Sequence, residues 1–299
     1  MSVHILENKQ GFKLALNSMG LSIQKIDLPW GVSPVIGYLD PNDYADNPHY
    51  LGSIIGRVSN RIANATLKIG HERHQLNANE GKHHLHGGKK GFTRVEWDLV
   101  NEGDKLVGKY TSPYGAEGYP GEVDVKSAFS FIDNKLIIVD NAYSKTHTPL
   151  SLTHHPYFSF GGGFEDLEWN IFGNKFLELD HDLIPTGEIV KEQKLVLRKG
   201  IDTCCVYPFS DNGYRKNAEI LHQKSNTKIS IWSNYPAFQI YTSLNELDNV
   251  SVPFGSASIC IEPQYMTGFT EYSNFNGFYF DGNNSYERRI VYEFDKINA

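Results

Sequence analysis

Alternating hydrophobic and polar residues dominate the chain. The clearest example is the run in which Val123, Val125, Ser127, Phe129 and Phe131 occupy every second position. Such alternation is typical of an antiparallel strand with one packed face. Similar runs bounded by turn residues predict strands at 12–16, 21–26, 66–69, 71–76, 97–100, 105–110, 136–139, 167–171, 176–179, 228–233, 237–242, 257–262 and 289–294. No βαβ alternation occurs, so the pattern predicts an all-β fold with meandering antiparallel strands.

Three parts of the chain depart from simple alternation. In the segment 51–62 the apolar residues have helical spacing, although two glycines weaken a helix. We expect this segment to bury one side and to hold Asn60 and Arg61 near its end. The segment 180–188, with proline and glycine at turn positions, predicts a loop. The segment 200–206 places Asp202 beside a hydrophobic strand.

Composition and charge narrow the class of protein. The chain has 299 residues, 40% of them hydrophobic, which is enough for a large core. The formal net charge of -7 argues against a nucleic-acid partner. No apolar run approaches the length of about eighteen residues that a membrane span needs. The N-terminal residues lack the features of a secretory signal, so we expect a cytoplasmic protein.

The cysteines do not indicate a disulfide framework. There are 3 of them, and Cys204 and Cys205 are adjacent, while Cys260 stands in a distant apolar run. Neighbouring side chains on a strand point to opposite faces, so the adjacent pair is a poor metal site. We expect all of them to be buried and unreactive.

Two adjacent histidines stand in the stretch 151–160. The run before them suits a strand, and Pro156 pushes His155 toward an extended conformation. Neighbours on an extended backbone face opposite ways, so only one of His154 and His155 can face a given pocket. That histidine would be a candidate proton donor, and the alternative is one histidine in water and one in the core. We expect three aromatic residues to wall it: Tyr157, Phe158 and Phe160.

A glycine-rich stretch at 81–92 contains His83, His84 and His86. Glycines allow sharp bends and a close approach to a ligand. If the run is extended, His84 and His86 share a face, which suggests a metal site. However, no carboxylate stands at a recognisable metal spacing, and a structural loop with solvated histidines is the alternative. We predict that the chain uses no metal.

A carboxylate ends the apolar run at 257–262. Glu262 is followed by Pro263, which we expect to stop the strand from continuing in the ladder. The side chain is either a base in a pocket or a solvated strand end. Partial burial would raise its pKa toward the range useful for removing a proton.

Six motifs in order resemble the aldose 1-epimerase (galactose mutarotase) family, and they cover nearly the whole chain. The resemblance implies one domain over residues 1–299, folded as a large antiparallel β-sandwich of the galactose mutarotase type, or supersandwich, without a cofactor. The matching motifs are Gly56-Arg-Val-Ser-Asn-Arg-Ile62, His84-Leu-His-Gly-Gly88 with Gly91-Phe92, Thr153-His-His-Pro-Tyr-Phe158, Leu183-Ile-Pro-Thr-Gly-Glu188, Gln239-Ile-Tyr-Thr242 and Ile261-Glu-Pro-Gln264.

The resemblance also implies roles for individual side chains. Glu262 is similar to the catalytic base of the family and His155 to its catalytic acid. His86 resembles the second active-site histidine, and Arg61 the arginine that orients the sugar. His154 stands where the family usually has asparagine, so His155 is the one expected to face the pocket. The expected substrate contacts are Asn60, Asp202, Gln239 and Tyr157.

These residue types suit the opening and reclosure of a cyclic sugar. Glu262 would take the proton of the C1 hydroxyl while His155 protonates the ring oxygen, and reclosure from the other face would reverse both transfers. Each such group typically contributes about 10²–10⁴ in rate. We expect the carboxylate and the imidazolium to favour each other's charged forms. The expected partner is therefore a small-molecule sugar, an aldose.

Other functions on the same fold stay open. The sequence around Asp202 lacks the preceding aromatic residue and the following histidine common in the family, so the preferred sugar is undecided. A hexose-6-phosphate epimerase would need a cationic clamp, for which Lys82, Lys89 and Lys90 are candidates. A sugar-binding module without turnover and a metal-dependent isomerase are the further alternatives.

Overall fold

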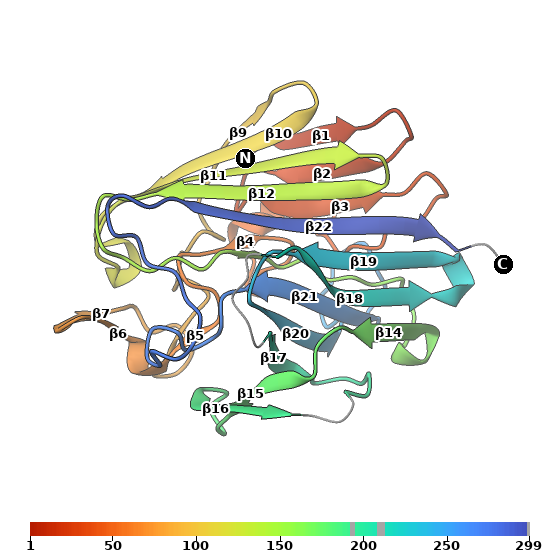
Figure 1. Ribbon diagram of the computed structural model, residues 1–299. Helices are drawn as coiled ribbons and strands as arrows, with labels where there is room; N and C mark the ends of the chain where they lie inside the picture. Colours follow the sequence, from red (N-terminus) through yellow and green to blue (C-terminus); the bar gives the residue numbers. More distant parts are fainter. Residues whose placement is uncertain (192–194, 208–212, 298–299) are drawn as a thin grey trace.

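A computed structural model describes residues 1–191, 195–207 and 213–297 of the chain. Its regular structure is almost entirely antiparallel strand, as the alternation predicts (Figure 1). None of the helical segments in these ranges is long and apolar enough to span a membrane. They are short 3₁₀ turns: η1 (Pro41–Ala45), η2 (Ala63–Ala65), η3 (Ala116–Gly118), η4 (Phe164–Asp166) and η5 (Gln223–Ser225).

An eight-stranded antiparallel sheet forms the largest layer (Figure 1). Along β11 the residues alternate between buried and exposed positions over most of the strand, so one face packs and the other meets solvent. In spatial order the strands are β14 (Leu167–Ile171), β18 (Arg215–His222), β19 (Thr227–Ser233), β22 (Tyr286–Lys296), β12 (Lys135–Tyr143), β11 (Val123–Ile132), β10 (Lys105–Ser112) and β9 (Asp98–Asn101).

Smaller sheets complete the sandwich. One has the order β16 (Pro185–Lys191), β15 (Lys175–Leu179), β17 (Asp202–Val206), β20 (Ala237–Leu244) and β21 (Ala257–Gln264). Another is formed by β1 (Val3–Glu7), β2 (Lys13–Asn17) and β3 (Ser22–Asp27). The remaining strands form pairs: β4 (Ile54–Ile55) with β13 (Thr153–His154), β5 (Arg61–Ile62) with β8 (His84–Leu85), and β6 (Thr66–Ile69) with β7 (Glu72–Gln75).

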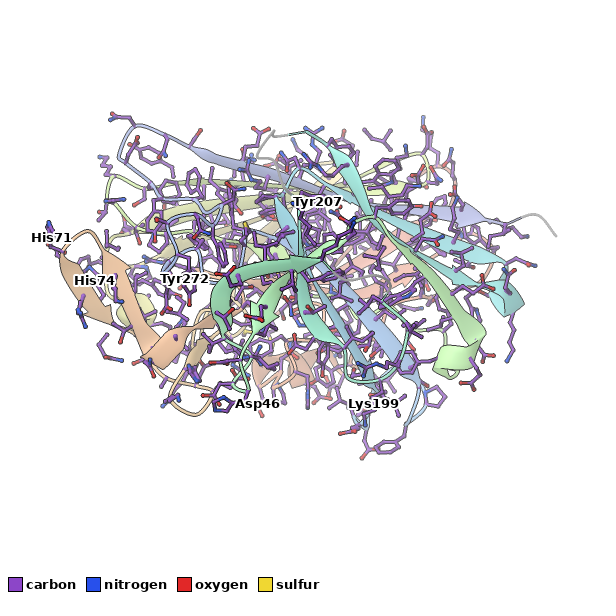
Figure 2. The ribbon with its side chains drawn as sticks, turned by 60° about the horizontal axis from the view of Figure 1, so that its bottom comes forward. Asp46, His71, His74, Lys199, Tyr207 and Tyr272 are labelled. Atoms are coloured by element: carbon purple, nitrogen blue, oxygen red, sulfur yellow. The ribbon has the colours of Figure 1, made fainter. Side chains whose placement is uncertain are left out.

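The sheets share a hydrophobic core. Leu14 from β2, Phe129 from β11, Ile138 from β12 and Ile240 from β20 are all fully buried members of one contiguous cluster. Strands from three sheets therefore pack their apolar faces together, which is the large antiparallel sandwich predicted. The β6–β7 hairpin, with His71 and His74, projects from this body (Figure 2).

The segment 51–62 forms no helix. It contains β4 and β5, and its residues 51–60 are all buried rather than buried on one side. A Cβ atom at Gly52 would lie 2.3 Å from the carbonyl oxygen of Ile23, and one at Gly56 would lie 2.4 Å from the ring of Phe92. The segment therefore passes closely between other parts of the chain, and burial on all sides explains its apolar content.

Two strand boundaries also differ from those expected. β21 continues through Pro263 to Gln264, because β21 lies at the edge of its sheet, where proline is tolerated. Only the first part of 180–188 is a turn, closed by hydrogen bonds from the backbone N–H groups of Asp182 and Ile184 to Oδ1 of Asp180. The rest belongs to β16.

The cysteines are buried, as expected, and none of them is bonded to another. Burial raises the pKa of the Cys204 thiol to about 12 and that of Cys260 well above its usual value. Both thiols therefore stay protonated near neutral pH, which agrees with a packing role.

Candidate active site

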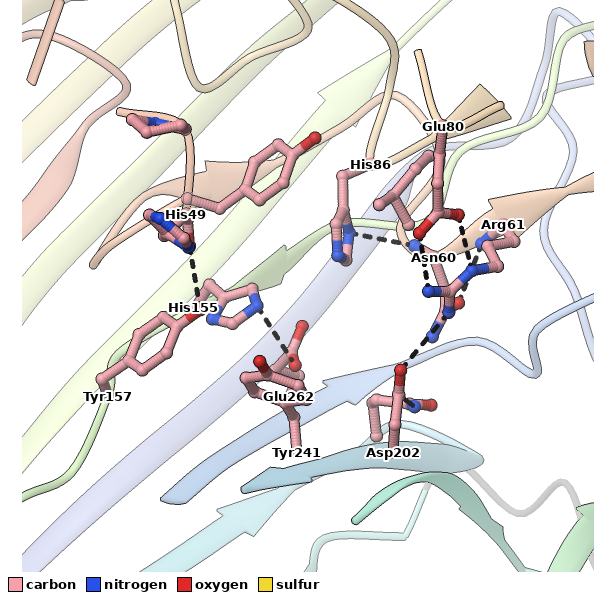
Figure 3. A pocket seen from close by; sticks show the side chains of 14 residues that line it. His49, Asn60, Arg61, Glu80, His86, His155, Tyr157, Asp202, Tyr241 and Glu262 are labelled. Carbon is pink, nitrogen blue, oxygen red and sulfur yellow. Dashed lines mark hydrogen bonds and ion pairs between the residues drawn. The ribbon is translucent and has the colours of Figure 1, made fainter. Parts of the chain in front are cut away.

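A polar pocket of about 290 Å³ lies beside the five-stranded sheet (Figure 3). All the side chains proposed from the sequence as catalytic or substrate-binding are among the residues that line it. The lining consists of Pro48, His49, Tyr50, Asn60, Arg61, Glu80, Leu85, His86, His155, Tyr157, Asp202, Gln239, Tyr241 and Glu262.

Three neighbouring strands, β17, β20 and β21, form one side of the pocket. Asp202 begins β17, Gln239 lies on β20 and Glu262 lies near the end of β21. In the ladder Gln239 is directly opposite Glu262, and Tyr241 is directly opposite Asp202. Because directly paired residues and residues two apart share a face, the four side chains point to the same side of the sheet.

The opposite side is formed around β5 and β8, where Arg61 pairs with Leu85. The backbone N–H of Asn60 donates to Nδ1 of His86 at 3.2 Å, and the N–H of His86 donates to the carbonyl of Asn60 at 3.1 Å. Tyr50, Asn60 and His86 have φ angles of 57°, 64° and 52°. Residues other than glycine rarely adopt this region, and those that do cluster at functional sites.

His155 and Glu262 meet at the closed end of the pocket. Nε2 of His155 lies 3.5 Å from Oε1 of Glu262, and the residues are only 4% and 1% exposed. His154 points the opposite way, into the core, with its Nε2 3.2 Å from Oδ1 of Asp140. The two histidines thus occupy opposite faces of the extended segment, and the structure places His155 in the pocket.

Aromatic rings surround His155. The ring of Tyr157 stacks on its imidazole with centroids 4.9 Å apart, and Tyr241 approaches it edge-on at 6.4 Å. The hydroxyl of Tyr157 donates to the carbonyl of His49 at 2.9 Å. Tyr157 therefore lines the pocket as expected, but in this structure its hydroxyl is engaged by the backbone and its ring supports His155.

The two phenylalanines expected to wall the pocket lie elsewhere. Phe158 packs in the core against Tyr292, with ring centroids 5.4 Å apart. Phe160 stacks on His222 at 4.4 Å. The physical reason is alternation, because residues 158 and 160 face away from the side that Tyr157 faces.

Burial is the main electrostatic influence on the two groups at the closed end. It lowers the pKa of His155 from 6.5 to about 4. It raises the pKa of Glu262 well above 4.5, and Asp202 adds to that rise. Burial therefore favours a neutral imidazole and a protonated carboxyl group. The expectation that the two groups hold each other charged is wrong for this state, because desolvation outweighs the attraction.

A chain of polar contacts runs along one wall of the pocket (Figure 3). Nε and Nη2 of Arg61 donate to the carboxylate of Glu80 at 2.7 and 2.8 Å, and Nη1 lies 3.5 Å from Oδ2 of Asp202. Gln239 in turn donates from Nε2 to Asp202. Although burial opposes it, the hydrogen bonds to Glu80 raise the pKa of Arg61 above its usual value, so the guanidinium stays charged.

Two buried oxygens in this pocket have no hydrogen-bond partner among the described residues. They are Oε1 of Gln239 and Oε2 of Glu262. Buried polar atoms are nearly always paired in folded proteins, so each needs an explanation. Neither oxygen has exposed surface, so a polar molecule in the pocket would supply a donor only after the side chain turned toward it.

The sequence reasoning missed several lining residues, of which Glu80 is the most important. Its contact with Arg61 spans 19 positions, across η2 and the β6–β7 hairpin, and no local pattern indicates it. Tyr241 could have been found, because it lies two residues from Gln239 on the same strand and therefore shares its face.

Within the described residues, one group of side chains could reach a common metal ion: His86, His155 and Glu262. The hydrogen bonding of His86 argues against that use. Its Nδ1 accepts from the backbone of Asn60, so in the neutral ring Nε2 carries the proton. If Nε2 bound a metal, the proton of the neutral ring would lie on Nδ1. Nδ1 could then no longer accept the hydrogen bond from the backbone N–H of Asn60. Burial, followed by the charges of His155 and Arg61, lowers the pKa of His86 well below 6.5, so the neutral ring is favoured.

His84, another histidine of the glycine-rich stretch, serves the fold. Nδ1 of His84 donates to the carbonyl of Asn77 at 2.7 Å, and Tyr119 donates to its Nε2 at 2.8 Å. His84 is fully buried and does not line the pocket. The shared face expected for His84 and His86 is absent because the positive φ of His86 interrupts the extended run.

The lysines considered for a phosphate clamp do not line this pocket. Lys89 and Lys90 are exposed, and their backbone N–H groups donate to the carboxylate of Glu117. Nζ of Lys82 lies 2.9 Å from Oδ2 of Asp182 in an adjoining hollow. The pocket itself contains Arg61, whose charge is already shared between two carboxylates.

Comparison with known proteins identifies the family. The aldose 1-epimerase family model matches residues 2–292. The chain belongs to the aldose 1-epimerase family. It is 31% identical to the galactose mutarotase of Homo sapiens over 255 residues, which cover 77% of this chain and 74% of that protein. It is 26% identical to the maltose epimerase of Levilactobacillus brevis over 328 aligned positions, which cover 99% and 95% of the two chains.

Solved structures agree on the fold. An aldose epimerase homologue from C. elegans superposes with a TM-score of 0.89 at 23% identity, covering 99% of this chain and all of the other. The galactose mutarotase-like sandwich predicted from the sequence is therefore confirmed. As a member of the aldose 1-epimerase family, the protein is an isomerase that acts on carbohydrates.

Proposed function

We propose that this aldose 1-epimerase interconverts the α and β anomers of a free aldose, with Glu262 as the base and His155 as the acid. The observation that carries the proposal is the 3.5 Å approach of these side chains at the closed end of a polar pocket. The two oxygens on an anomeric carbon are separated by that single atom. Groups this close together can therefore act on both oxygens at once.

In the opening step, the carboxylate of Glu262 takes the proton from the C1 hydroxyl. His155 gives its proton to the ring oxygen, the bond from C1 to that oxygen breaks, and C1 becomes an aldehyde. After rotation about C1–C2, the hydroxyl that was formed from the ring oxygen attacks the other face of the aldehyde. His155 recovers its proton from the attacking hydroxyl, and Glu262 returns its proton to the oxygen on C1.

The pair needs only one proton for the whole cycle. Opening moves the pair from imidazolium and carboxylate to imidazole and carboxylic acid, and closure moves it back. Burial favours the neutral form, through the lowered pKa of His155 and the raised pKa of Glu262. Sugar hydroxyls would solvate the charged form, which brings the two forms closer in free energy.

The other lining residues suit binding and charge stabilisation. His86 presents a neutral Nε2–H, which can donate to an oxygen on which negative charge develops. Arg61 is held by Glu80 in a fixed orientation and can donate to a sugar hydroxyl. Asn60, Asp202 and Gln239 can form hydrogen bonds with sugar hydroxyls, and Tyr157 presents its ring to the pocket.

The preferred sugar is proposed only by class. The names of the relatives mention galactose and maltose, and both are neutral sugars with a free anomeric carbon. A 6-phosphorylated sugar is less suitable, because Arg61 in the pocket already faces Glu80, and Lys82 in the adjoining hollow already faces Asp182. We therefore favour an unphosphorylated aldose.

The decisive experiment is polarimetry on freshly dissolved α-anomers of galactose, glucose, xylose and glucose 6-phosphate. We expect acceleration over buffer for the free sugars and full activity after treatment with a chelator. No acceleration of any sugar would refute the proposal. Sugar binding without acceleration would instead indicate a binding module, and preference for the phosphorylated sugar would indicate a hexose-6-phosphate epimerase.

A further inference from the structure

A second buried histidine stands next to the proposed acid, and the proposed mechanism does not use it. His154 is 0% exposed and does not line the pocket. Its Nε2 lies 3.2 and 3.3 Å from the two carboxyl oxygens of Asp140, which is 1% exposed on β12. The hydroxyl of Ser127, on β11, donates to the same carboxyl group at 2.6 Å. Asp140 and His154 thus connect β13 to the large sheet through buried polar atoms.

The contact with Asp140 fixes the ring of His154 in one orientation. An ionised carboxylate can only accept hydrogen bonds, so Nε2 carries a proton and donates to Asp140. Nδ1 has no hydrogen-bond partner among the described residues, which agrees with a neutral ring that is protonated on Nε2. The ring of Phe129 packs edge-on against the imidazole, with centroids 5.4 Å apart and an interplanar angle of 89°. β11 and β12 therefore hold His154 both by packing and by a hydrogen bond.

The strand that leads to the proposed acid is short. β13 contains only Thr153 and His154, and it pairs with β4, which also has two residues. The backbone N–H of His155 donates to the carbonyl of Ser53, and its carbonyl accepts from the N–H of Gly52, each at 3.0 Å. The side chain of His154 faces the large sheet, whereas that of His155 faces Glu262 on β21. A short strand between two sheets is therefore held from one side by His154, while His155 reaches toward the other.

Few contacts fix the ring of His155 itself. Its Nδ1 has no hydrogen-bond partner among the described residues, and its Nε2 is 3.5 Å from Glu262, which is longer than a usual hydrogen bond. The ring of Tyr157 stacks on it and leaves its position along the strand to the backbone. Because a displacement of about 1 Å can cost about 10²-fold in rate, a side chain that fixes this backbone affects the reaction.

We propose that His154 is a positioning residue for the proposed acid, and that its hydrogen bond to Asp140 holds the backbone from which His155 reaches the sugar. The inference rests on the proposed function, in which His155 protonates the ring oxygen. His154 does not line the pocket, so it acts only through its neighbour. Loss of the hydrogen bond lets β13 shift relative to the large sheet, which moves the imidazole without removing a substrate contact.

The test uses two substitutions of His154 that differ in reach. The amide nitrogen of glutamine is as many bonds from Cα as Nε2 of histidine, so His154→Gln can still donate to Asp140. The amide nitrogen of asparagine corresponds to Nδ1, so His154→Asn falls short. Asp140→Leu/His154→Leu removes both partners, so that no buried carboxylate loses its donor. His222→Asn is the matched control, because His222 is a buried histidine of β18 that does not line the pocket.

The measurements are kcat and KM for galactose by polarimetry, and the folded fraction and Tm by circular dichroism. We expect kcat per folded protein to fall about tenfold in His154→Asn and in the double variant, with KM changed by less than about twofold. His154→Gln should stay within about threefold of the unmodified kcat, because its hydrogen bond is kept. His222→Asn should keep both constants. If His154→Asn does not fold, the double variant decides.

Each other outcome counts against the positioning role. A lower Tm with an unchanged kcat in His154→Asn and in the double variant would show that His154 serves stability alone. Equal losses in His154→Gln and His154→Asn would show that the hydrogen bond is not responsible. A raised KM with an unchanged kcat would assign His154 to the shape of the pocket, and an equal loss in His222→Asn would show a general effect of replacing a buried histidine. If the unmodified protein accelerates no sugar, the proposed function fails; if it accelerates galactose and the variants do so equally, only the positioning role fails.

Discussion

Replacing Glu262 with glutamine should remove activity and at the same time stabilise the fold at neutral and alkaline pH. The side chain is 1% exposed, and Oε2 has no hydrogen-bond partner among the described residues. Glutamine has nearly the same shape and cannot take a proton. The substitution therefore separates the chemistry of the carboxyl group from its packing.

The expected stability change follows from the raised pKa of Glu262. In the unfolded chain the carboxyl group titrates near 4.5, whereas burial keeps it protonated to higher pH in the folded chain. Between these two values the folded state binds more protons, so stability falls as pH rises, by about 1.4 kcal/mol per pH unit. Glutamine is free of this loss. Each pH unit between the two pKa values therefore corresponds to a Tm difference of roughly 2–3 °C for a chain of this length.

The measurement is a thermal unfolding series from about pH 5 to about pH 8, with polarimetry on the same samples. The Tm advantage of Glu262→Gln should be small at the acid end and should grow with pH. Glu168→Gln is the control, because Glu168 is exposed on β14 and should show no such trend. The anomerisation rate of Glu262→Gln should fall about 10²–10⁴-fold, with sugar affinity largely kept.

Three results would count against the reasoning. A Tm difference between Glu262→Gln and the unmodified protein that does not depend on pH would show that the carboxyl group is not held uncharged by burial. Retained anomerisation in Glu262→Gln would show that this group is not the base. Loss of activity together with loss of sugar binding would point to a defect in pocket shape and would require a different assignment of Glu262.

Three further predictions concern the same pocket. The pair carries one proton in its active form, so activity is lost at low pH when His155 takes up a second proton. Because burial lowers the pKa of His155 to about 4, this acid limb of the kcat/KM profile should lie well below pH 6.5. An acid limb near pH 6.5 would contradict the assignment. Glu80→Ala should raise KM about tenfold and change kcat by less than about threefold, because Arg61 loses its bidentate partner. Glu80→Asp should recover part of this loss. A tenfold fall in kcat for Glu80→Ala would instead assign Glu80 a role in the reaction itself. Tyr157→Phe keeps the ring stacked on His155 and loses only the hydrogen bond to the carbonyl of His49, so kcat/KM should fall less than about tenfold. Tyr157→Ala also removes the ring, so kcat/KM should fall about a hundredfold. Similar losses in the two variants would disprove the stacking role.

Local patterns predicted most of the strands and the all-β class, whereas the sandwich type came from the family resemblance. Alternation such as that of β11 depends on one strand packing against one core, and it can be read directly from neighbouring residues. The opposite orientations of His154 and His155 follow from the same rule. Residues 51–60 are all buried, so the spacing of their apolar residues does not indicate which side of the chain faces the core. The helical spacing in this segment was therefore misleading.

Which of the two histidines faces the pocket, and which residues meet it, depends on the tertiary structure. The contacts of Glu262 with His155 and of Glu80 with Arg61 join segments that no local rule relates. The protonation of the pair also depends on the fold, because desolvation is set by the atoms that cover both groups. The sequence by itself predicted most of the strands, the family resemblance and the candidates for the reacting groups. The tertiary structure decided their spacing and their charge, since both depend on atoms far away along the chain.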